Sequence, residues 1–292
     1  MATSQAGAVT SNAAGAPVTA SATPSPAIVE FRDVSKRFSK DGREFTAIRN
    51  VSFRIDDHPG CGEFISVLGP SGCGKSTLIR LIAGLTPQFP ASSGQVSVFG
   101  RAVLGPGADR GMVFQDYTSF EHLSVLDNVG FGLMLRGVGE RERRDQALAW
   151  VQKVGLNPNT DAQKYPSELS GGMRQRVAIA RTLILKPRII LMDEPFGALD
   201  PGTRASMQEL LKALWAEQQA TVFFITHAMD EAAYLSQRAL IFSRGPGTIA
   251  HDVQLPSVSA PVREAQRDPG FQASVQNLRD LMDSVESPIS ER

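Results

Sequence analysis

The sequence has few cysteines, no long apolar run and no excess of charge of either sign. Its two cysteines, Cys61 and Cys73, belong to no CxxC pair or metal-spaced cluster, which fits a reducing cytoplasm. Lys and Arg together number 30, as do Asp and Glu, so no net field draws the chain to nucleic acid or anionic lipid, and we expect no nucleic-acid partner. Apolar runs such as residues 129–135 and 221–225 are far shorter than the roughly 20 residues that span a bilayer. Any membrane role must therefore come through a partner.

What is present is the composition of a folded globular chain. With 292 residues, 42% of them hydrophobic and 21% charged, the chain can bury a substantial core. Residues 1–27 are mainly small residues and proline, with neither positive charge nor a sustained apolar stretch, so we expect a disordered leader rather than a signal peptide. We expect the folded domain to cover residues 28–258, followed by a C-terminal extension, 259–292, with one amphipathic helix at 271–285.

Strand-like and helix-like segments alternate through the folded part. Apolar runs that start near residues 28 and 47 predict an antiparallel β layer. Further strands are expected at 63–68, 111–114, 188–192 and 221–225, and helices at 75–83, within 124–155, from 171 to before 187, at 201–218 and at 230–235. Alternation of this kind predicts an α/β fold with a mostly parallel sheet.

The strongest motif lies between the expected strand at 63–68 and the expected helix at 75–83. It matches G-x-x-x-x-G-K-[ST] and consists of Gly69, Pro70, Ser71, Gly72, Cys73, Gly74, Lys75, Ser76 and Thr77. Its glycines let the backbone wrap a phosphate, so that successive N–H groups and the positive end of the helix face the anion. Lys75 would then bridge the β and γ phosphates, Ser76 would bind Mg²⁺, and Thr77 would donate to the α phosphate. The competing interpretation is a glycine-rich turn with a surface lysine.

Two acids, Asp193 and Glu194, follow the apolar run at 188–192. They lie where a parallel strand ends, at the sheet edge that binds ligands in α/β proteins. Asp193 would hold the Mg²⁺ shell, and Glu194 would orient or deprotonate the attacking water. An acidic strand end by itself can be an exposed helix cap, but the phosphate loop favours the catalytic interpretation.

A second anion site is indicated by Ser170, Gly171 and Gly172, which open a helix within the segment 169–175. Two phosphate-binding helix termini in one domain suggest that two surfaces hold each nucleotide. The alternative is an ordinary helix N-terminus capped by Ser170.

These motifs together resemble those of the ABC ATPase family, from about residue 28 to 249. They occur in the order of that family: phosphate loop, Gln115, 169–175, Asp193 and Glu194, 198–200 and His227. The resemblance implies a phosphate-loop NTPase core of RecA-like type, an antiparallel β layer and a helical subdomain inserted at about 116–172. It also implies ATP and Mg²⁺ as cofactors and ATP hydrolysis as the activity. Two copies of the chain would sandwich two ATP molecules, each held by the phosphate loop of one copy and by Ser170 to Gly172 of the other.

Further site residues follow from the resemblance alone. It assigns Gln115 to Mg²⁺ and to the link with the helical subdomain, and Asp200 to the interface between the two copies. It assigns His227 to the γ phosphate and the attacking water, and Phe38 to stacking on adenine, where tyrosine is commoner in the family.

The segments 115–117, 125–129, 169–176, 231–235 and 243–247 resemble those of importer ATPases for nitrate, taurine and aliphatic sulfonates. Resemblance to that branch implies that the chain binds two membrane-spanning permease subunits and works indirectly with a solute-binding protein. It also implies that the chain is a peripheral protein at the cytoplasmic face of the inner membrane. The chain departs from the branch at Glu121–His122, where Pro-Trp is frequent near the expected docking groove, at Ala228, where Asp is common, and at 57–61, a slightly enlarged loop. The transported solute is not encoded, because the cargo never contacts this subunit.

Other functions are compatible with part of the pattern. An ATPase for another solute or for an exporter would share the same motifs. An ABC protein acting on ribosomes or DNA usually carries two cassettes, a long coiled coil or zinc cysteines, which are missing here. A module that binds ATP without hydrolysing it is disfavoured by the presence of Lys75, Glu194 and His227.

Overall fold

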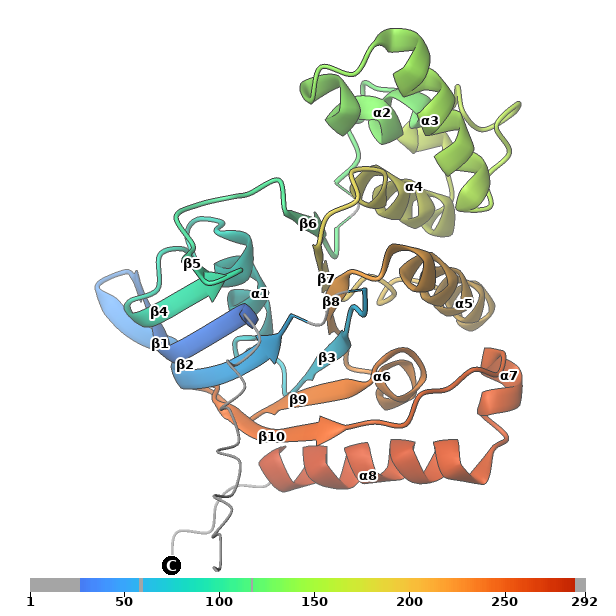
Figure 1. The fold of residues 1–292 in the computed structure, drawn as a ribbon. Helices are drawn as coiled ribbons and strands as arrows, with labels where there is room; N and C mark the ends of the chain where they lie inside the picture. Colours follow the sequence, from blue (N-terminus) through green and yellow to red (C-terminus); the bar gives the residue numbers. More distant parts are fainter. Residues whose placement is uncertain (1–26, 58–59, 117, 287–292) are drawn as a thin grey trace, which may run out of the picture.

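A six-stranded sheet forms the centre of the molecule in the computed structural model, which describes residues 27–57, 60–116 and 118–286 (Figure 1). The strand order is β10-β9-β3-β8-β7-β6, and all neighbours are parallel except β10, which is antiparallel to β9. The strands are β3 (Phe64–Leu68), β6 (Arg110–Val113), β7 (Ile189–Asp193), β8 (Thr221–Ile225), β9 (Arg238–Phe242) and β10 (Ile249–Gln254). The predicted α/β fold with a mostly parallel sheet is confirmed.

The predicted antiparallel layer is a separate four-stranded sheet of order β2-β1-β4-β5. It consists of β1 (Ala27–Lys40), β2 (Arg43–Asp56), β4 (Ser93–Val98) and β5 (Arg101–Ala102). The predicted leader lies outside the described residues except for Ala27, which is buried and begins β1. Helix α1 (Lys75–Ala83) contacts strands of both sheets, so the phosphate loop that precedes it lies where the two sheets meet.

The central strands β3, β7 and β8 are buried along their whole length, and their side chains divide into two cores. Because side chains alternate across a strand, Ile65, Leu191 and Phe223 face α1 and the antiparallel sheet. Phe64, Ile190 and Phe224 point to the other face, toward the helices. Strands covered on both sides read as continuous apolar runs, which is why the sequence located them.

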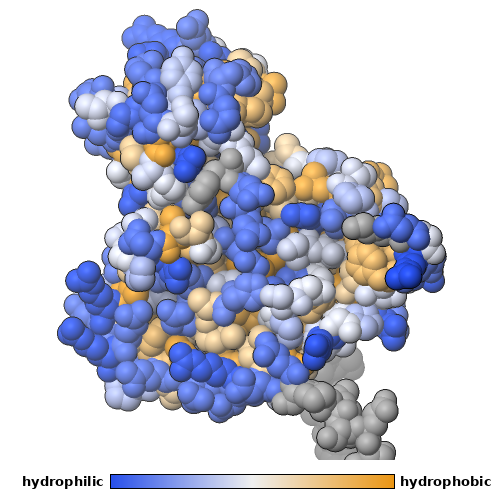
Figure 2. All heavy atoms as spheres, turned by 180° about the vertical axis from the view of Figure 1, so that it is seen from behind, coloured by the Kyte–Doolittle hydropathy of each residue, from blue (hydrophilic) through white to orange (hydrophobic). Residues whose placement is uncertain are grey.

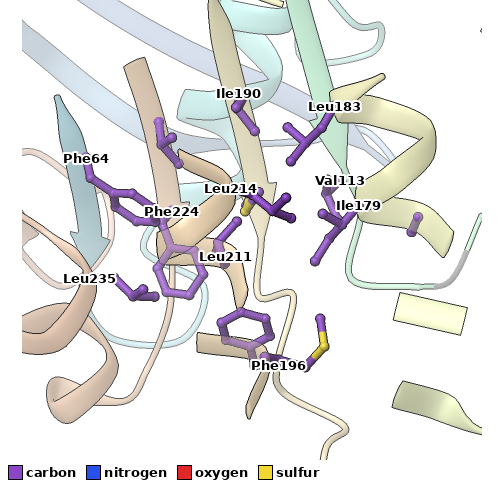
Figure 3. Close-up of a cluster of buried hydrophobic side chains, with 14 of the residues drawn as sticks. Phe64, Val113, Ile179, Leu183, Ile190, Phe196, Leu211, Leu214, Phe224 and Leu235 are labelled. Atoms are coloured by element: carbon purple, nitrogen blue, oxygen red, sulfur yellow. The ribbon is translucent and has the colours of Figure 1, made fainter. Parts of the chain in front are cut away.

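Helices cover that second face. Figure 3 shows Phe64 and Phe224 of the sheet close to Phe196 and to Leu211 and Leu214 of α5. The covering helices are α5 (Pro201–Gln218), α6 (Met229–Leu235), α7 (Val262–Ala265) and α8 (Pro269–Glu286).

A helical lobe stands apart from both sheets in Figure 1. It is built by α2 (Val125–Leu135), α3 (Glu140–Lys153), the 3₁₀ turn η1 (Pro166–Glu168) and α4 (Gly171–Leu183). Helix α4 also contacts β6, so it joins the lobe to the sheet. This lobe is inserted between β6 and β7. The sequence predicts a helical subdomain at about 116–172, and the last helix of the lobe, α4, continues to Leu183.

The segment after residue 258 differs from the expectation of one helix beyond the core. It contains the short α7 as well as α8, and Phe271, Val275, Leu278 and Met282 of α8 join the main hydrophobic cluster. Helix α8 packs on α6 and β9, and this contact removes its apolar stripe from water. The residues along this lower edge of the molecule are mostly hydrophilic in Figure 2. Among the described residues, no helix has the length and apolar character needed to cross a bilayer.

Candidate functional site

The phosphate loop connects β3 to α1 and has the backbone shape that its glycines predict. Gly74 precedes the first residue of α1 with φ 101°, in the left-handed region that favours glycine. A Cβ on Gly74 would lie 2.4 Å from Cγ2 of Ile48 and 2.8 Å from the carbonyl oxygen of Ala47. The antiparallel sheet thus packs directly on the loop and holds the N-terminus of α1 in place.

Lys75 is held by the loop itself. Its side chain is buried, and its Nζ donates to the carbonyl oxygens of Gly69 at 2.7 Å and Pro70 at 3.0 Å. Burial lowers the pKa of Lys75, while the nearby Cys73, Glu194 and Asp193 oppose that shift. The ammonium group therefore lies in a partly dehydrated site that acids of the sheet edge help to keep charged.

Ser76 and Asp193 meet at the end of β7. The Ser76 hydroxyl donates to Oδ1 of Asp193 at 2.9 Å, and a guanidinium nitrogen of Arg80 lies 3.3 Å from Oδ2. Asp193 is only 2% exposed, and burial raises its pKa, whereas the Ser76 bond and the Arg80 charge lower it. A hydroxyl and a carboxylate at this spacing are the hard oxygen donors that Mg²⁺ prefers. These two residues fit that ion, with the remaining positions left to phosphate oxygens and water.

Glu194 follows directly after β7 and lies between two other predicted site residues. Its Oε1 is 2.8 Å from Nε2 of His227, and its Oε2 is 3.5 Å from Nε2 of Gln115. Glu194 has φ 46°, an unusual conformation for a residue other than glycine that sets its direction at the strand end. Because β6, β7 and β8 are parallel neighbours, Gln115, Glu194 and His227 all come from the same edge of the sheet.

A cavity of about 780 Å³ connects these groups to the antiparallel sheet. Its lining includes Phe38, Ser71, Gly72, Gly74, Lys75, Ser76, Thr77, Glu194 and His227. The cavity also reaches Phe45, whose ring stacks on that of Phe38 with centroids 5.3 Å apart. One end is therefore aromatic, and the other offers the phosphate loop, the Lys75 ammonium group and the Glu194 carboxylate.

The remaining predicted residues do not line this cavity. Gly69 and Pro70 hold Lys75 through their carbonyl oxygens, and the Cys73 side chain is buried against the core. Ser170, Gly171, Gly172 and Asp200 lie elsewhere on the same chain. The Ser170 hydroxyl accepts from the N–H of Met173 and caps α4, and Asp200 caps α5.

Two contributors were missed by the sequence reasoning. Arg80 pairs with Asp193, and the signal for it was its spacing of four residues from Ser76, which places both on one face of α1. Phe45 faces Phe38 across the hairpin of β1 and β2, and the alternation within two adjoining strands could have paired them.

Comparison with known proteins agrees with this geometry. Residues 48–197 match the family model described as ABC transporter. The nitrate import ATP-binding protein of a Synechocystis species is 46% identical over 228 residues, which cover 78% of this chain and 82% of that protein. The taurine import ATP-binding protein of Rhizobium johnstonii is 44% identical over 250 residues, covering 84% of this chain and 92% of that protein.

A solved structure shares both the fold and part of the sequence. It is a dimeric ATP-binding cassette in a post-hydrolysis state, bound to ADP and Pi. The two chains are 31% identical and superpose with a TM-score of 0.67. The match covers 79% of this chain and 100% of the cassette. The phosphate loop, the acids at the strand end and these similarities lead to one conclusion. The chain belongs to the ABC transporter family and is one of its ATP-binding subunits.

Proposed function

We propose that this chain is the ATP-hydrolysing subunit of an importer that takes up a small anion, such as nitrate, taurine or an aliphatic sulfonate. The position of Glu194 carries the hydrolytic part of the proposal, because Glu194 contacts both His227 and Gln115 beside the phosphate loop. The solute class rests on the names of relatives that are 46% and 44% identical.

The triphosphate lies along the loop, and the base lies at the aromatic end of the cavity. Lys75 exchanges the carbonyl oxygens of Gly69 and Pro70 for oxygens of the β and γ phosphates, which carry more negative charge. Backbone N–H groups of residues 71–77 point toward the phosphates at the start of α1, and Thr77 donates to the α phosphate. Adenine stacks on Phe38.

Ser76 and Asp193 would hold Mg²⁺, with Gln115 as a further contact. The described residues contain no group of three or more His, Cys, Asp or Glu side chains that could hold a metal ion by themselves. A site completed by phosphate oxygens agrees with that, because Mg²⁺ commonly binds through one or two protein ligands and substrate phosphates. When bound, the ion neutralises charge that develops on the β and γ phosphates.

The attacking water is oriented by Glu194 and His227. Glu194 accepts the proton of the water, and His227 lies within hydrogen-bond distance of Glu194 and faces the same cavity. His227 thereby contacts the γ phosphate and keeps Glu194 aimed at the water. Gln115 contacts Glu194 from the segment that leads into the helical lobe, so it links hydrolysis to movement of that lobe.

A second copy completes the site. The cavity leaves out Ser170, Gly171, Gly172 and Asp200, although the Ser170 turn is a helix N-terminus suited to phosphate. In the dimer, the Ser170 turn of one copy covers the γ phosphate bound by the other, and Asp200 lies at the interface. The similar cassette bound to ADP and Pi is itself dimeric.

The partners follow from the importer assignment. Two permease subunits carry the solute across the inner membrane, and a solute-binding protein delivers it to them. This chain binds the cytoplasmic face of the permeases, near Glu121 and His122. Export, or import of a different solute, is the competing function, and it is tested by comparing uptake of nitrate, taurine and an alkanesulfonate in cells with wild-type or Glu194→Gln protein.

The hydrolytic role is tested with Glu194→Gln in the full chain. The variant should bind ATP with unchanged affinity and lose turnover by about 100-fold or more, because the water loses its base. Glu140→Gln is the matched control, since Glu140 is an exposed residue at the start of α3. Turnover of Glu194→Gln close to that of the control would remove Glu194 from this role.

The shared site is tested by adding Ser170→Arg to the Glu194→Gln chain. Glu194→Gln alone should dimerise when ATP is added, as measured by light scattering after gel filtration. The added arginine should block dimerisation while each monomer still binds ATP, because the block acts across the interface. Ser284→Arg on the exposed side of α8 is the control. ATP-dependent dimers of the double variant, or normal turnover of the chain that carries Ser170→Arg alone, would overturn the shared site.

A further inference from the structure

A polar cluster lies beside the pair formed by His227 and Glu194. It consists of the buried Thr226 and Glu231 (α6) and the half-buried Arg204 (α5), and it lines a second cavity of about 350 Å³. Glu194 and His227 line this cavity as well as the nucleotide cavity. Contacts that hold Glu194 and His227 in the second cavity therefore also hold one side of the nucleotide cavity.

Glu231 is connected to the backbone on both sides of His227. Its Oε2 accepts a hydrogen bond from the Thr226 hydroxyl at 2.5 Å, and the same hydroxyl accepts one from the N–H of Ala228 at 3.0 Å. Thr226 and Glu231 are each 4% exposed, so water does not compete for these bonds. One carboxylate thus anchors the residue before His227 directly and the residue after it through a shared hydroxyl.

The other oxygen of Glu231 faces Arg204. The Nε of Arg204 lies 3.7 Å from Oε1 of Glu231, and its Nη2 donates to the carbonyl oxygen of Leu199 at 2.9 Å. Leu199 directly precedes Asp200, the N-terminal cap of α5. The cluster therefore connects the turn that carries Asp200 with the strand end that carries His227.

A buried carboxylate is costly unless it is paired and hydrogen-bonded. Burial raises the pKa of Glu231, whereas the Thr226 bond and the Arg204 charge lower it. If the only need were to pack α6 on α5, apolar residues would serve at lower cost. The hydrogen bond to Thr226 and the ion pair with Arg204 are the features that apolar packing would not provide.

We propose that Glu231 is a positioning residue that acts through Thr226 to hold His227 against Glu194, and through Arg204 to link that contact to the turn of Asp200. The inference rests on the proposed hydrolytic function. Since Asp200 is proposed to lie at the interface between copies, the cluster gives a route by which pairing of the copies sets the position of His227.

The first experiment reads the position of His227 without any turnover. The full chain is studied by NMR of its histidine rings, with the His227 signal assigned from a His227→Gln variant. Glu194→Ala gives the shift of a ring that has lost its partner. Thr226→Val removes the hydroxyl that donates to Glu231, so it should move the His227 signal toward that value. Thr226→Ser keeps the hydroxyl and should restore the wild-type signal. The control is Thr221→Val, which alters an equally buried threonine, 4% exposed, at the opposite end of β8.

The second experiment measures the consequence. Thr226→Val and Glu231→Gln should lower kcat for ATP hydrolysis by about 10-fold or more with KM changed less than about twofold, the pattern of an interaction that matters in the transition state. Thr226→Ser should recover most of the kcat. A purely structural cluster would instead lower the melting temperature, with kcat and KM changing together and an unmoved His227 signal, and that result would overturn the inference. If the wild-type chain hydrolyses no ATP, the proposed function fails, while the NMR comparison still decides the positioning role.

Discussion

The ammonium group of Lys75 donates to the carbonyl oxygen of Gly69 at 2.7 Å, so the phosphate loop holds its own lysine. Both carbonyl contacts of Lys75 come from residues at the start of the loop, five and six positions before it. The lysine thus lines the nucleotide cavity, where the proposed phosphate oxygens would replace these carbonyl oxygens.

Replacement of Lys75 by methionine should reduce ATP affinity by about 10- to 100-fold, because a hydrogen bond to a charged group is worth roughly 1.5–3 kcal/mol. Calorimetric titration of the full chain with ATP measures this loss. The control is Lys153→Met in α3, outside the cavity. Equal affinities for the two variants would show that Lys75 does not contact the phosphates.

Two glycines of the loop offer a matched pair of substitutions. Both have positive φ, 101° for Gly74 and 76° for Gly72, but a Cβ meets Ile48 at 2.4 Å only at Gly74, whereas at Gly72 nothing lies within 4 Å. Gly72→Ala should cost about 1–2 kcal/mol for the left-handed backbone. Gly74→Ala should cost a further 1–3 kcal/mol or so for overpacking. Urea unfolding of both variants checks the order, and a smaller loss for Gly74→Ala would contradict the contact with the antiparallel sheet.

Phe38→Ala should weaken ATP binding by about 2- to 12-fold, because stacking of aromatic rings contributes roughly 0.5–1.5 kcal/mol. Affinity for inorganic tripolyphosphate should stay unchanged, since that ligand has no base. Titrations with both ligands separate loss of stacking from damage to the loop. If Phe45→Ala shows the loss and Phe38→Ala does not, the base lies on the other ring of this stacked pair.

Lys212 should make stability depend on pH above neutrality. Its Nζ donates to the carbonyl oxygens of Tyr234, at 2.8 Å, and Val258, and burial lowers the pKa of Lys212 from 10.5 to about 8. Between these two values the unfolded chain binds more protons than the folded chain, so the free energy of unfolding rises with pH. Below about pH 8 both states carry the proton and this contribution stays constant.

The measurement compares urea unfolding of the wild type and Lys212→Met at about pH 7, 8.5 and 9.5, within and below that window. The wild-type free energy of unfolding, minus that of the variant, should increase with pH. A difference that stays flat or falls would show that Lys212 keeps its ordinary pKa in the fold.

The parts of the fold that the sequence predicts well depend on local pattern. Strands β3, β7 and β8 are apolar throughout because both their faces are covered, and the phosphate loop is defined by residues that follow one another in the chain. The place of the C-terminal segment depends on more than local pattern. Helix α8 has the expected amphipathic pattern, but the pattern does not reveal that its apolar stripe completes the main core on α6 and β9.

The candidate site likewise contains residues that the sequence reveals and contacts that only the packing of the elements creates. Arg80 lies near Ser76 in the sequence, and its contact with Asp193 depends on β7 reaching α1. The pairing of Arg204 with Glu231 depends on how α5 and α6 pack, because the two residues lie on different helices. No local signal marks Arg204 or Glu231, because a charged residue on a helix is usually exposed.

The sequence by itself determined that this chain binds a triphosphate: the glycine loop with Lys75 and the acids that end an apolar strand specify that chemistry through neighbouring residues. Only the tertiary structure decided that Gln115, 79 positions before Glu194, and His227 both contact it. The reason is the strand order. Helical crossovers let β6, β7 and β8 become parallel neighbours, so their carboxyl ends meet at one edge, and that order is set by packing of the whole domain rather than by any single segment.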